Sequence, residues 1–151
     1  MIDRRTFVQY GVTGLTATLA GGAFELTGPG IGSRIGSWTG SEAAPEPHLA
    51  LFDRRFAAAR KFAQTTRAQG ISTRAITSDV TWVWFNELHP LWKQRPVAIA
   101  GLTTYAPLFC LERLAWDHGM RVIQRDQHDI RSPTEPDQPL YAWVIAPRRS
   151  V

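Results

Sequence analysis

The chain has 151 residues, of which 17 are lysine or arginine and 13 are aspartate or glutamate, so its formal net charge is +4. It contains a single cysteine, which excludes an internal disulfide bond and a cysteine-based metal cluster. The basic residues are scattered along the chain, whereas a nucleic-acid-binding protein usually concentrates them on one face. We therefore expect no nucleic-acid partner.

The first 24 residues have the composition and the order of an export signal. Arg4 and Arg5 are followed by Thr6 and Phe7, and a weakly apolar run then extends over residues 12–24. This run is shorter than the ~20 predominantly apolar residues that a membrane-spanning helix needs. A basic start, a short apolar core and small residues after it are typical of a signal peptide rather than of the folded domain.

This segment resembles the twin-arginine (Tat) export signal, whose pattern is Ser/Thr-Arg-Arg-x-Phe-Leu-Lys. Arg4, Arg5 and Phe7 match the pattern, Val8 is a conservative replacement, and the residues on either side depart from it. The resemblance implies that the Tat translocase exports the chain already folded, to the periplasm or another extracytoplasmic location. Membrane attachment would follow only if the signal stays uncleaved. The alternative is an amphipathic N-terminal helix that begins with two arginines.

Residues 25–47 are rich in glycine, proline and serine and have little apolar periodicity, which is typical of a flexible linker. Residues 48–147 are long enough for one small domain with a modest core. The last four residues, 148–151, form a short basic tail.

Within residues 48–147, short apolar runs alternate with segments rich in helix-forming residues. The expected helices are 54–69, which ends at Gly70, 80 to about 89, which ends before Pro90, and 104–118, which ends at Gly119. The expected strands are 48–52, 72–77, 97–100, 121–124 and 140–145. The second strand is the least hydrophobic, which favours a position near the edge of the sheet.

This alternation predicts an α/β domain of three layers, with a mainly parallel sheet of four to five strands. The first four strands are expected to be parallel. Residues 125–139 leave no room for a helix, so the fifth strand can be antiparallel. The alternation resembles small Rossmann-like or flavodoxin-like domains, and this likeness of fold implies no function by itself.

Ligands of open α/β sheets bind beyond the carboxyl ends of the strands. The candidate ligand-binding residues there are Asp53, Asp79, Gly101, Thr103 and Thr104. Gly101 would let the backbone approach a ligand, and free N–H groups at a helix start could bind an anion. The alternative is that Asp53, Asp79 and Thr104 only cap helices.

No further catalytic, cofactor or metal motif is present in the sequence. Neither G-x-G-x-x-G nor G-x-x-x-x-G-K-[ST] occurs, so no cofactor is expected. The histidines and aspartates match no metal-ligand spacing. Cys110 lies in the middle of an expected helix, where a free cysteine usually behaves as a small buried hydrophobic residue. We therefore expect no metal and identify no catalytic residue.

Aromatic residues crowd residues 82–92. On one helix, Trp82, Phe85 and His89 would share a face, whereas Trp84 would lie on another. Only one of these faces can cover the sheet. The second is either buried under other parts of the chain or exposed as a partner-binding surface that includes Trp82, Trp84 and Trp92.

Two functions therefore remain open. The first is a non-catalytic accessory subunit that is exported with a larger, for example redox, partner protein. The second is a small stand-alone enzyme or ligand-binding protein that uses the carboxyl edge of the sheet. Edge residues engaged by backbone N–H groups would favour the first, and a pocket with a displaced Asp79 side chain would favour the second.

Overall fold

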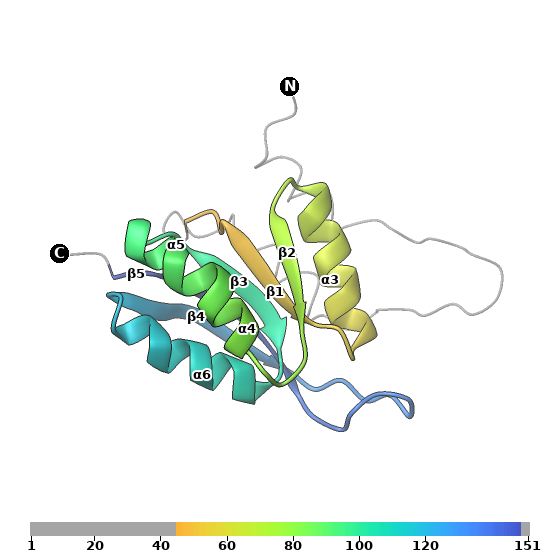
Figure 1. The fold of residues 1–151 in the computed structure, drawn as a ribbon. Coiled ribbons are helices and arrows are strands. Elements are labelled where there is room, and N and C mark those ends of the chain that lie inside the picture. Colours follow the sequence, from red (N-terminus) through yellow and green to blue (C-terminus); the bar gives the residue numbers. More distant parts are fainter. Residues whose placement is uncertain (1–44, 149–151) are drawn as a thin grey trace. The chain divides into compact units, whose positions relative to one another are not determined.

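The computed structural model describes residues 45–148 and is shown in Figure 1. The predicted signal segment, residues 25–44 of the predicted linker and residues 149–151 lie outside the described residues. The strands are β1 (Leu49–Asp53), β2 (Ser72–Ile76), β3 (Ile99–Thr103), β4 (Met120–His128) and β5 (Leu140–Pro147). The helices are α3 (Ala57–Ala68), α4 (Thr81–Val83), the π-helical turn η2 (Trp84–Leu88), α5 (His89–Gln94) and α6 (Tyr105–Trp116).

The five strands form one mixed sheet in the order β2-β1-β3-β5-β4. β1 pairs in parallel with β2 and β3, whereas β5 pairs antiparallel with both β3 and β4. The first four strands therefore run in one direction and β5 runs in the other, which confirms the predicted α/β fold and its antiparallel last strand. β2 lies at one edge of the sheet, as its polar sequence predicted.

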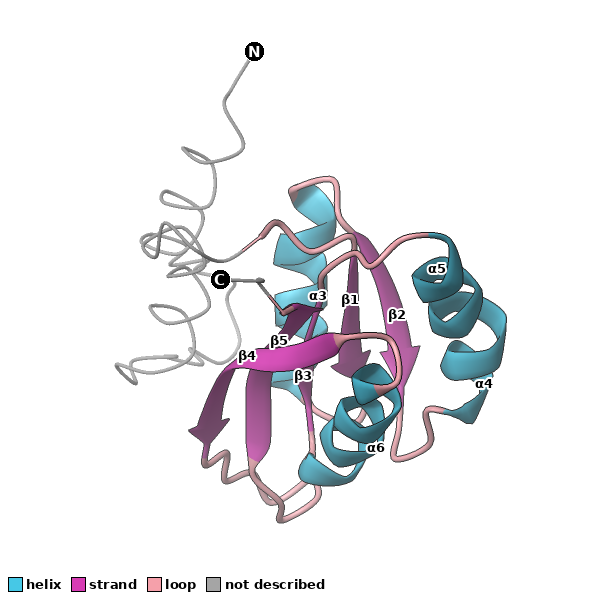
Figure 2. Cartoon of the chain, turned by 90° about the vertical axis from the view of Figure 1, so that its left-hand side faces the viewer, coloured by secondary structure: helices cyan, strands magenta, loops and turns pink. Residues whose placement is uncertain are grey.

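The helices cover both faces of the sheet, which gives three layers (Figure 2). α3 packs on one face and contacts β1, β2 and β3. The other face carries α4–α5 and α6, whose apolar side chains join those of β1, β3 and β5 in the main core cluster. The alternation of side chains along a strand explains this division, because Leu49 and Leu51 join that cluster while Ala50 points to the opposite face.

The first and third predicted helices have shorter bounds than expected, and both are closed by glycine. Gly70 and Gly119 follow α3 and α6 with φ values of 82° and 69°. Glycine adopts this left-handed conformation without steric cost, and the Gly70 N–H donates to the carbonyl of Arg67. The two glycines therefore close these helices as predicted, although the last helical residues are Ala68 and Trp116 rather than residues 69 and 118.

The second predicted helix does not end before Pro90 but continues to Gln94, so that prediction is wrong. The reason is η2, in which the His89 N–H donates to the carbonyl of Trp84, five residues earlier. Proline lacks an N–H and its ring clashes with the carbonyl four residues back. A wide π-helical turn immediately before Pro90 changes the spacing of those carbonyls, so the helix can accept the proline.

The central strand also differs from its predicted bounds of 97–100. β3 begins at Ile99 and extends through Gly101 to Thr103, since β1 on one side and β5 on the other provide pairing partners along this stretch. Gly101 and Thr103 therefore lie within the strand rather than in a loop after it. Likewise, β4 continues to His128, four residues beyond its predicted end.

Candidate functional site

Asp53 ends β1 at the carboxyl edge of the sheet, where its side chain is completely buried. Its carboxylate accepts hydrogen bonds from the backbone N–H, Nε and Nη2 of Arg55, at 3.0, 3.0 and 2.7 Å. These bonds raise the pKa of Arg55. The guanidinium thus compensates the buried negative charge, as a bidentate pair can. Asp53 is not the cap of α3, because Phe56 occupies that position.

Gly101 and Thr103 face the interior of the domain and hold Trp143 of β5. A Cβ atom on Gly101 would lie only 2.3 Å from Cζ2 of Trp143, so the indole ring occupies the space of the missing side chain. Trp143 Nε1 donates to Thr103 Oγ1 at 3.0 Å, and this hydroxyl donates to the carbonyl of Thr104. The alternation Ile99, Gly101, Thr103 is the sequence signal that predicts a shared face.

The N-terminus of α3 binds a carboxylate from a distant part of the chain. The backbone N–H of Ala57 donates to Oε1 of Glu135 at 2.6 Å, although the two residues are 78 positions apart. Glu135 belongs to the loop between β4 and β5. A carboxylate at this position satisfies a free N–H and interacts favourably with the helix dipole. No local sequence signal could have revealed this contact.

Asp79 and Thr104 lie at the starts of α4 and α6. Asp79 is exposed, and its Oδ1 accepts the backbone N–H of Thr81 at 2.8 Å. Hydrogen bonds from the side chain and backbone of Thr81 lower the pKa of the Asp79 carboxyl. Thr104 occupies the cap position of α6 but makes no side-chain capping bond. Of the three predicted caps, only Asp79 therefore accepts a bond from the first turn of a helix.

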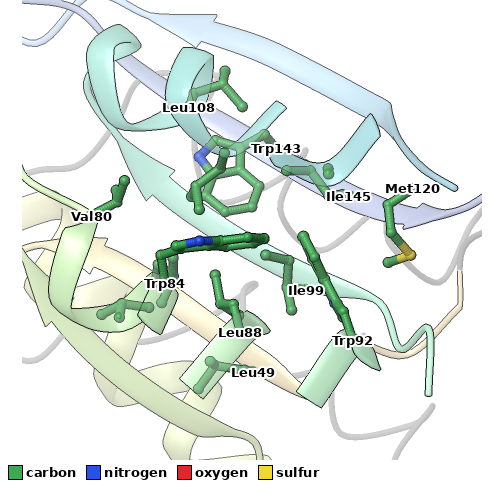
Figure 3. Close-up of a cluster of buried hydrophobic side chains, with 14 of the residues drawn as sticks. Leu49, Val80, Trp84, Leu88, Trp92, Ile99, Leu108, Met120, Trp143 and Ile145 are labelled. Atoms are coloured by element: carbon green, nitrogen blue, oxygen red, sulfur yellow. The ribbon is translucent and has the colours of Figure 1, made fainter. Parts of the chain in front are cut away.

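The aromatic helix segment divides into an inner and an outer side. Trp84 and Trp92 are buried against the sheet with Leu88, as Figure 3 shows, and Trp92 Nε1 donates to the carbonyl of Val97. Trp82 and Phe85 remain 62% and 64% exposed. Trp84 and Trp92 are therefore core residues, because their rings fill the space between this helix and the sheet. Only Trp82 among the three predicted tryptophans is available to a partner.

His89 does not share the exposed face with Trp82 and Phe85, contrary to expectation. The π-helical turn shifts the helix register, and His89 instead contacts the ring of Trp84, with 5.2 Å between ring centroids. His118 completes this aromatic cluster through contacts with Trp84, Trp92 and His89. Within residues 45–148, no group of three or more His, Cys, Asp or Glu side chains is arranged to hold a metal ion.

Cys110 is exposed, so the prediction that it is buried is wrong. The face of α6 that enters the core consists of Pro107, Leu108, Leu111 and Ala115. Cys110 lies on the opposite side of the helix, because successive residues are separated by about 100°.

Across the described part of the chain, no helix has the length and apolar character required to cross a membrane. No protein-family model and no curated protein sequence matches the chain. Among solved structures, the chain is similar to a candidate RNA methyltransferase from Pyrococcus horikoshii, with 8% identity over 97% of this chain and 98% of the other. The TM-score of this comparison is 0.35, which supports no conclusion about fold or function.

Proposed function

We propose that the protein is a non-catalytic accessory subunit, which the twin-arginine route exports already folded together with a larger protein, such as a periplasmic redox enzyme. The observation that carries this proposal is the exposure of Trp82 and Phe85, at 62% and 64%, on a helix whose inner side is fully used by the core. Large aromatic side chains are enriched among the residues that contribute most to protein interfaces. We call this pair, with the neighbouring Asn86, the Trp82 face.

Contacts within the domain hold the helix segment that carries the Trp82 face in a fixed position, which suits a docking surface. Asn86 Nδ2 donates to the carbonyl of Trp82 at 2.9 Å, and Glu87 forms an ion pair with Arg74 of β2. On the inner side, Trp84 and Leu88 anchor the same helix in the core. A rigid surface loses little conformational entropy when a partner binds, so more of the contact energy contributes to affinity.

Contacts at the carboxyl edge also support this proposal. The carboxylates of Asp53 and Asp79 bind N–H groups of the chain itself, and the hydroxyl of Thr103 binds Trp143. A ligand could contact the buried Asp53 carboxylate or the Thr103 hydroxyl only after these bonds were broken. The ligand-binding prediction for these residues stays a prediction.

The partner is tested by purifying the tagged full chain after native export and identifying any protein that co-purifies in fixed stoichiometry. The double variant Trp82→Ala/Phe85→Ala should weaken this complex, by on the order of 2 kcal/mol if either residue is a hot spot. Lys61→Ala/Gln64→Ala, on the exposed side of α3, serves as the matched control and should bind normally. A complex that is unaffected by the Trp82 and Phe85 changes would contradict the proposal.

Export is tested separately, with Arg4→Lys/Arg5→Lys in the full chain. The resemblance to the twin-arginine signal, carried by Arg4, Arg5 and Phe7, predicts that the precursor then accumulates in the cytoplasm. Cell fractionation and immunoblotting measure the distribution. Unchanged export of the lysine variant would remove the twin-arginine part of the proposal without affecting the docking part.

A further inference from the structure

Two histidines from different helices lie in contact beside Trp84 and Trp92. His89 begins α5 and His118 follows the end of α6, and the centroids of their rings are 5.6 Å apart. Both side chains are half-buried, so solvent reaches them. Because the two histidines come from distant parts of the sequence, no metal-ligand spacing could reveal them as a pair.

The ring nitrogens of this histidine pair are not used by other side chains. Within residues 45–148, neither imidazole forms a side-chain hydrogen bond or an ion pair. Their contacts are with each other and with the rings of Trp84 and Trp92. A neutral imidazole has one nitrogen without a proton, and this nitrogen is the commonest metal ligand in proteins. An indole nitrogen only donates, so the tryptophans shield the pair without competing for an ion.

The separation of the two rings fits a shared ion. A histidine nitrogen binds Zn²⁺ at about 2.0–2.1 Å, which places the centroids of two imidazoles on one tetrahedral ion roughly 5 Å apart. The observed separation of 5.6 Å is close to this value, and the two ring planes are inclined by 80°. Small rotations of the two side chains would therefore direct one nitrogen of each ring at the same point.

Two features of the backbone favour a cation at this place. The π-helical turn η2 closes at His89, whose N–H donates to the carbonyl of Trp84, and it brings the His89 side chain to His118 instead of to the exposed face. Single π-helical turns within helices are frequent at functional sites. His118 follows the C-terminus of the 12-residue helix α6, where the helix dipole is negative and attracts positive charge.

We propose that His89 and His118 together bind one divalent transition-metal ion, Cu²⁺ more tightly than Zn²⁺. Imidazole nitrogens suit both ions, and a given set of ligands usually has the higher affinity for Cu²⁺. Water would occupy the remaining coordination positions, because no third His, Cys, Asp or Glu side chain in the described part of the chain joins the pair. This inference is independent of the Trp82 face and of export.

The probe for this site is the Cu²⁺ ion alone, titrated into the full chain while tryptophan fluorescence is recorded. Cu²⁺ quenches nearby indole rings, and the ring centroid of Trp84 is 5.2 Å from that of His89 and 5.6 Å from that of His118. We expect quenching that saturates at one ion per chain and is reversed by EDTA. Zn²⁺, which has no redox chemistry and a filled d shell, should restore the fluorescence by competition at higher concentration.

Variants and spectroscopy complete the test. His89→Gln and His118→Gln should each weaken Cu²⁺ binding by about tenfold or more, because each removes one of two protein ligands. His48→Gln removes an exposed histidine before β1 and is the matched control, which should bind like the parent chain. Circular dichroism checks that each variant is folded.

Electron paramagnetic resonance of the parent complex requires no variant, and it should show Cu²⁺ coupled to two imidazole nitrogens. The proposal is overturned if quenching does not saturate, if fewer than two imidazoles are coupled to the ion, or if a folded His89→Gln or His118→Gln chain binds Cu²⁺ as tightly as the parent.

Discussion

The carboxyl edge of the sheet and the helix from Thr81 to Gln94 use their notable residues in opposite ways. At the edge, Asp53, Asp79 and Thr103 all form hydrogen bonds within the chain. On the helix, Trp82 and Phe85 are large apolar side chains that remain mostly in solvent. Burial of apolar surface is favourable, so such exposure is informative, whereas an internally bonded polar residue needs no ligand to explain it. This difference is why we propose the Trp82 face, rather than the carboxyl edge, as the surface that contacts a partner.

The largest expected change in stability comes from a substitution on the inner side of the helix, and the matching substitution on the outer side should have little effect. Trp84→Ala should destabilise the domain by about 3–5 kcal/mol, because it removes a buried ring and leaves a cavity beside Trp92 and His118. Trp82→Ala should change the free energy of unfolding by no more than about 0.5 kcal/mol. Urea denaturation measures both. Similar losses for the two variants would show that Trp82 also supports the fold, and the comparison would fail.

A somewhat smaller loss of stability is expected from Gly101→Ala in β3, near the carboxyl edge of the sheet. The new methyl group would overlap the ring of Trp143, and overpacking in a core typically costs about 1–3 kcal/mol. Combining this change with Trp143→Leu should give less destabilisation than the sum of the two single changes, because the smaller side chain frees the space. Thermal denaturation of the three variants checks this. Full additivity would mean that Gly101 has another role, such as the ligand approach that its position suggested.

The sequence predicted the order of the elements, because apolar runs, glycine caps and helix-forming segments are local signals. It failed where a helix is locally irregular and where distant parts of the chain meet. The helix continues beyond Pro90 because η2 precedes this proline, and the composition of residues 84–88 does not predict a π-helical turn. The sequence places Gly101 where a ligand could approach, but Trp143, 42 positions later, occupies that space. β3 and β4 are also longer than predicted, because they pair with neighbouring strands that sequence patterns do not specify.

The positions of the candidate site residues were predictable, because they follow from the order of the strands and helices. Asp53, Asp79 and Thr104 do lie near strand and helix ends, as the spacing of the elements indicated. Their hydrogen-bond partners were not predictable, since Arg55 competes with the helix for Asp53 and Glu135 comes from another loop. Helical periodicity separated Trp82 and Phe85 from Trp84, but it could not decide which side faced the sheet.

A smaller change in stability is expected from substitution of Glu135, which contacts the start of α3 at the carboxyl edge of the sheet. Glu135→Ala should destabilise the domain by about 0.5–1 kcal/mol, since it removes a hydrogen bond and a charge at the helix N-terminus. Glu135→Gln keeps an acceptor oxygen and should lose less. Asp137→Ala, in the same loop, is the control and should have little effect. Urea denaturation gives the values, and equal stability of the Glu135 and Asp137 variants would contradict an energetic role for the contact.

The smallest expected change in stability concerns Asp79, which lies between the carboxyl end of β2 and the start of α4. Its pKa is lowered below the ordinary value of 3.8 by the side-chain and backbone hydrogen bonds of Thr81. A lowered pKa in the folded state means that the ionised carboxylate stabilises the fold fully above the ordinary pKa. This contribution should decrease as the pH falls below 3.8 and vanish below the lowered pKa. Asp79→Asn should remove it, so that the stability of the parent chain falls toward that of the variant through that range, whereas parallel curves would contradict the contribution. The amide resonance of Thr81, followed by NMR in the parent chain, should shift with a midpoint below 3.8. A midpoint at or above that value would show that the Asp79 carboxylate is free, and Asp79 would then be available to a ligand at the carboxyl edge.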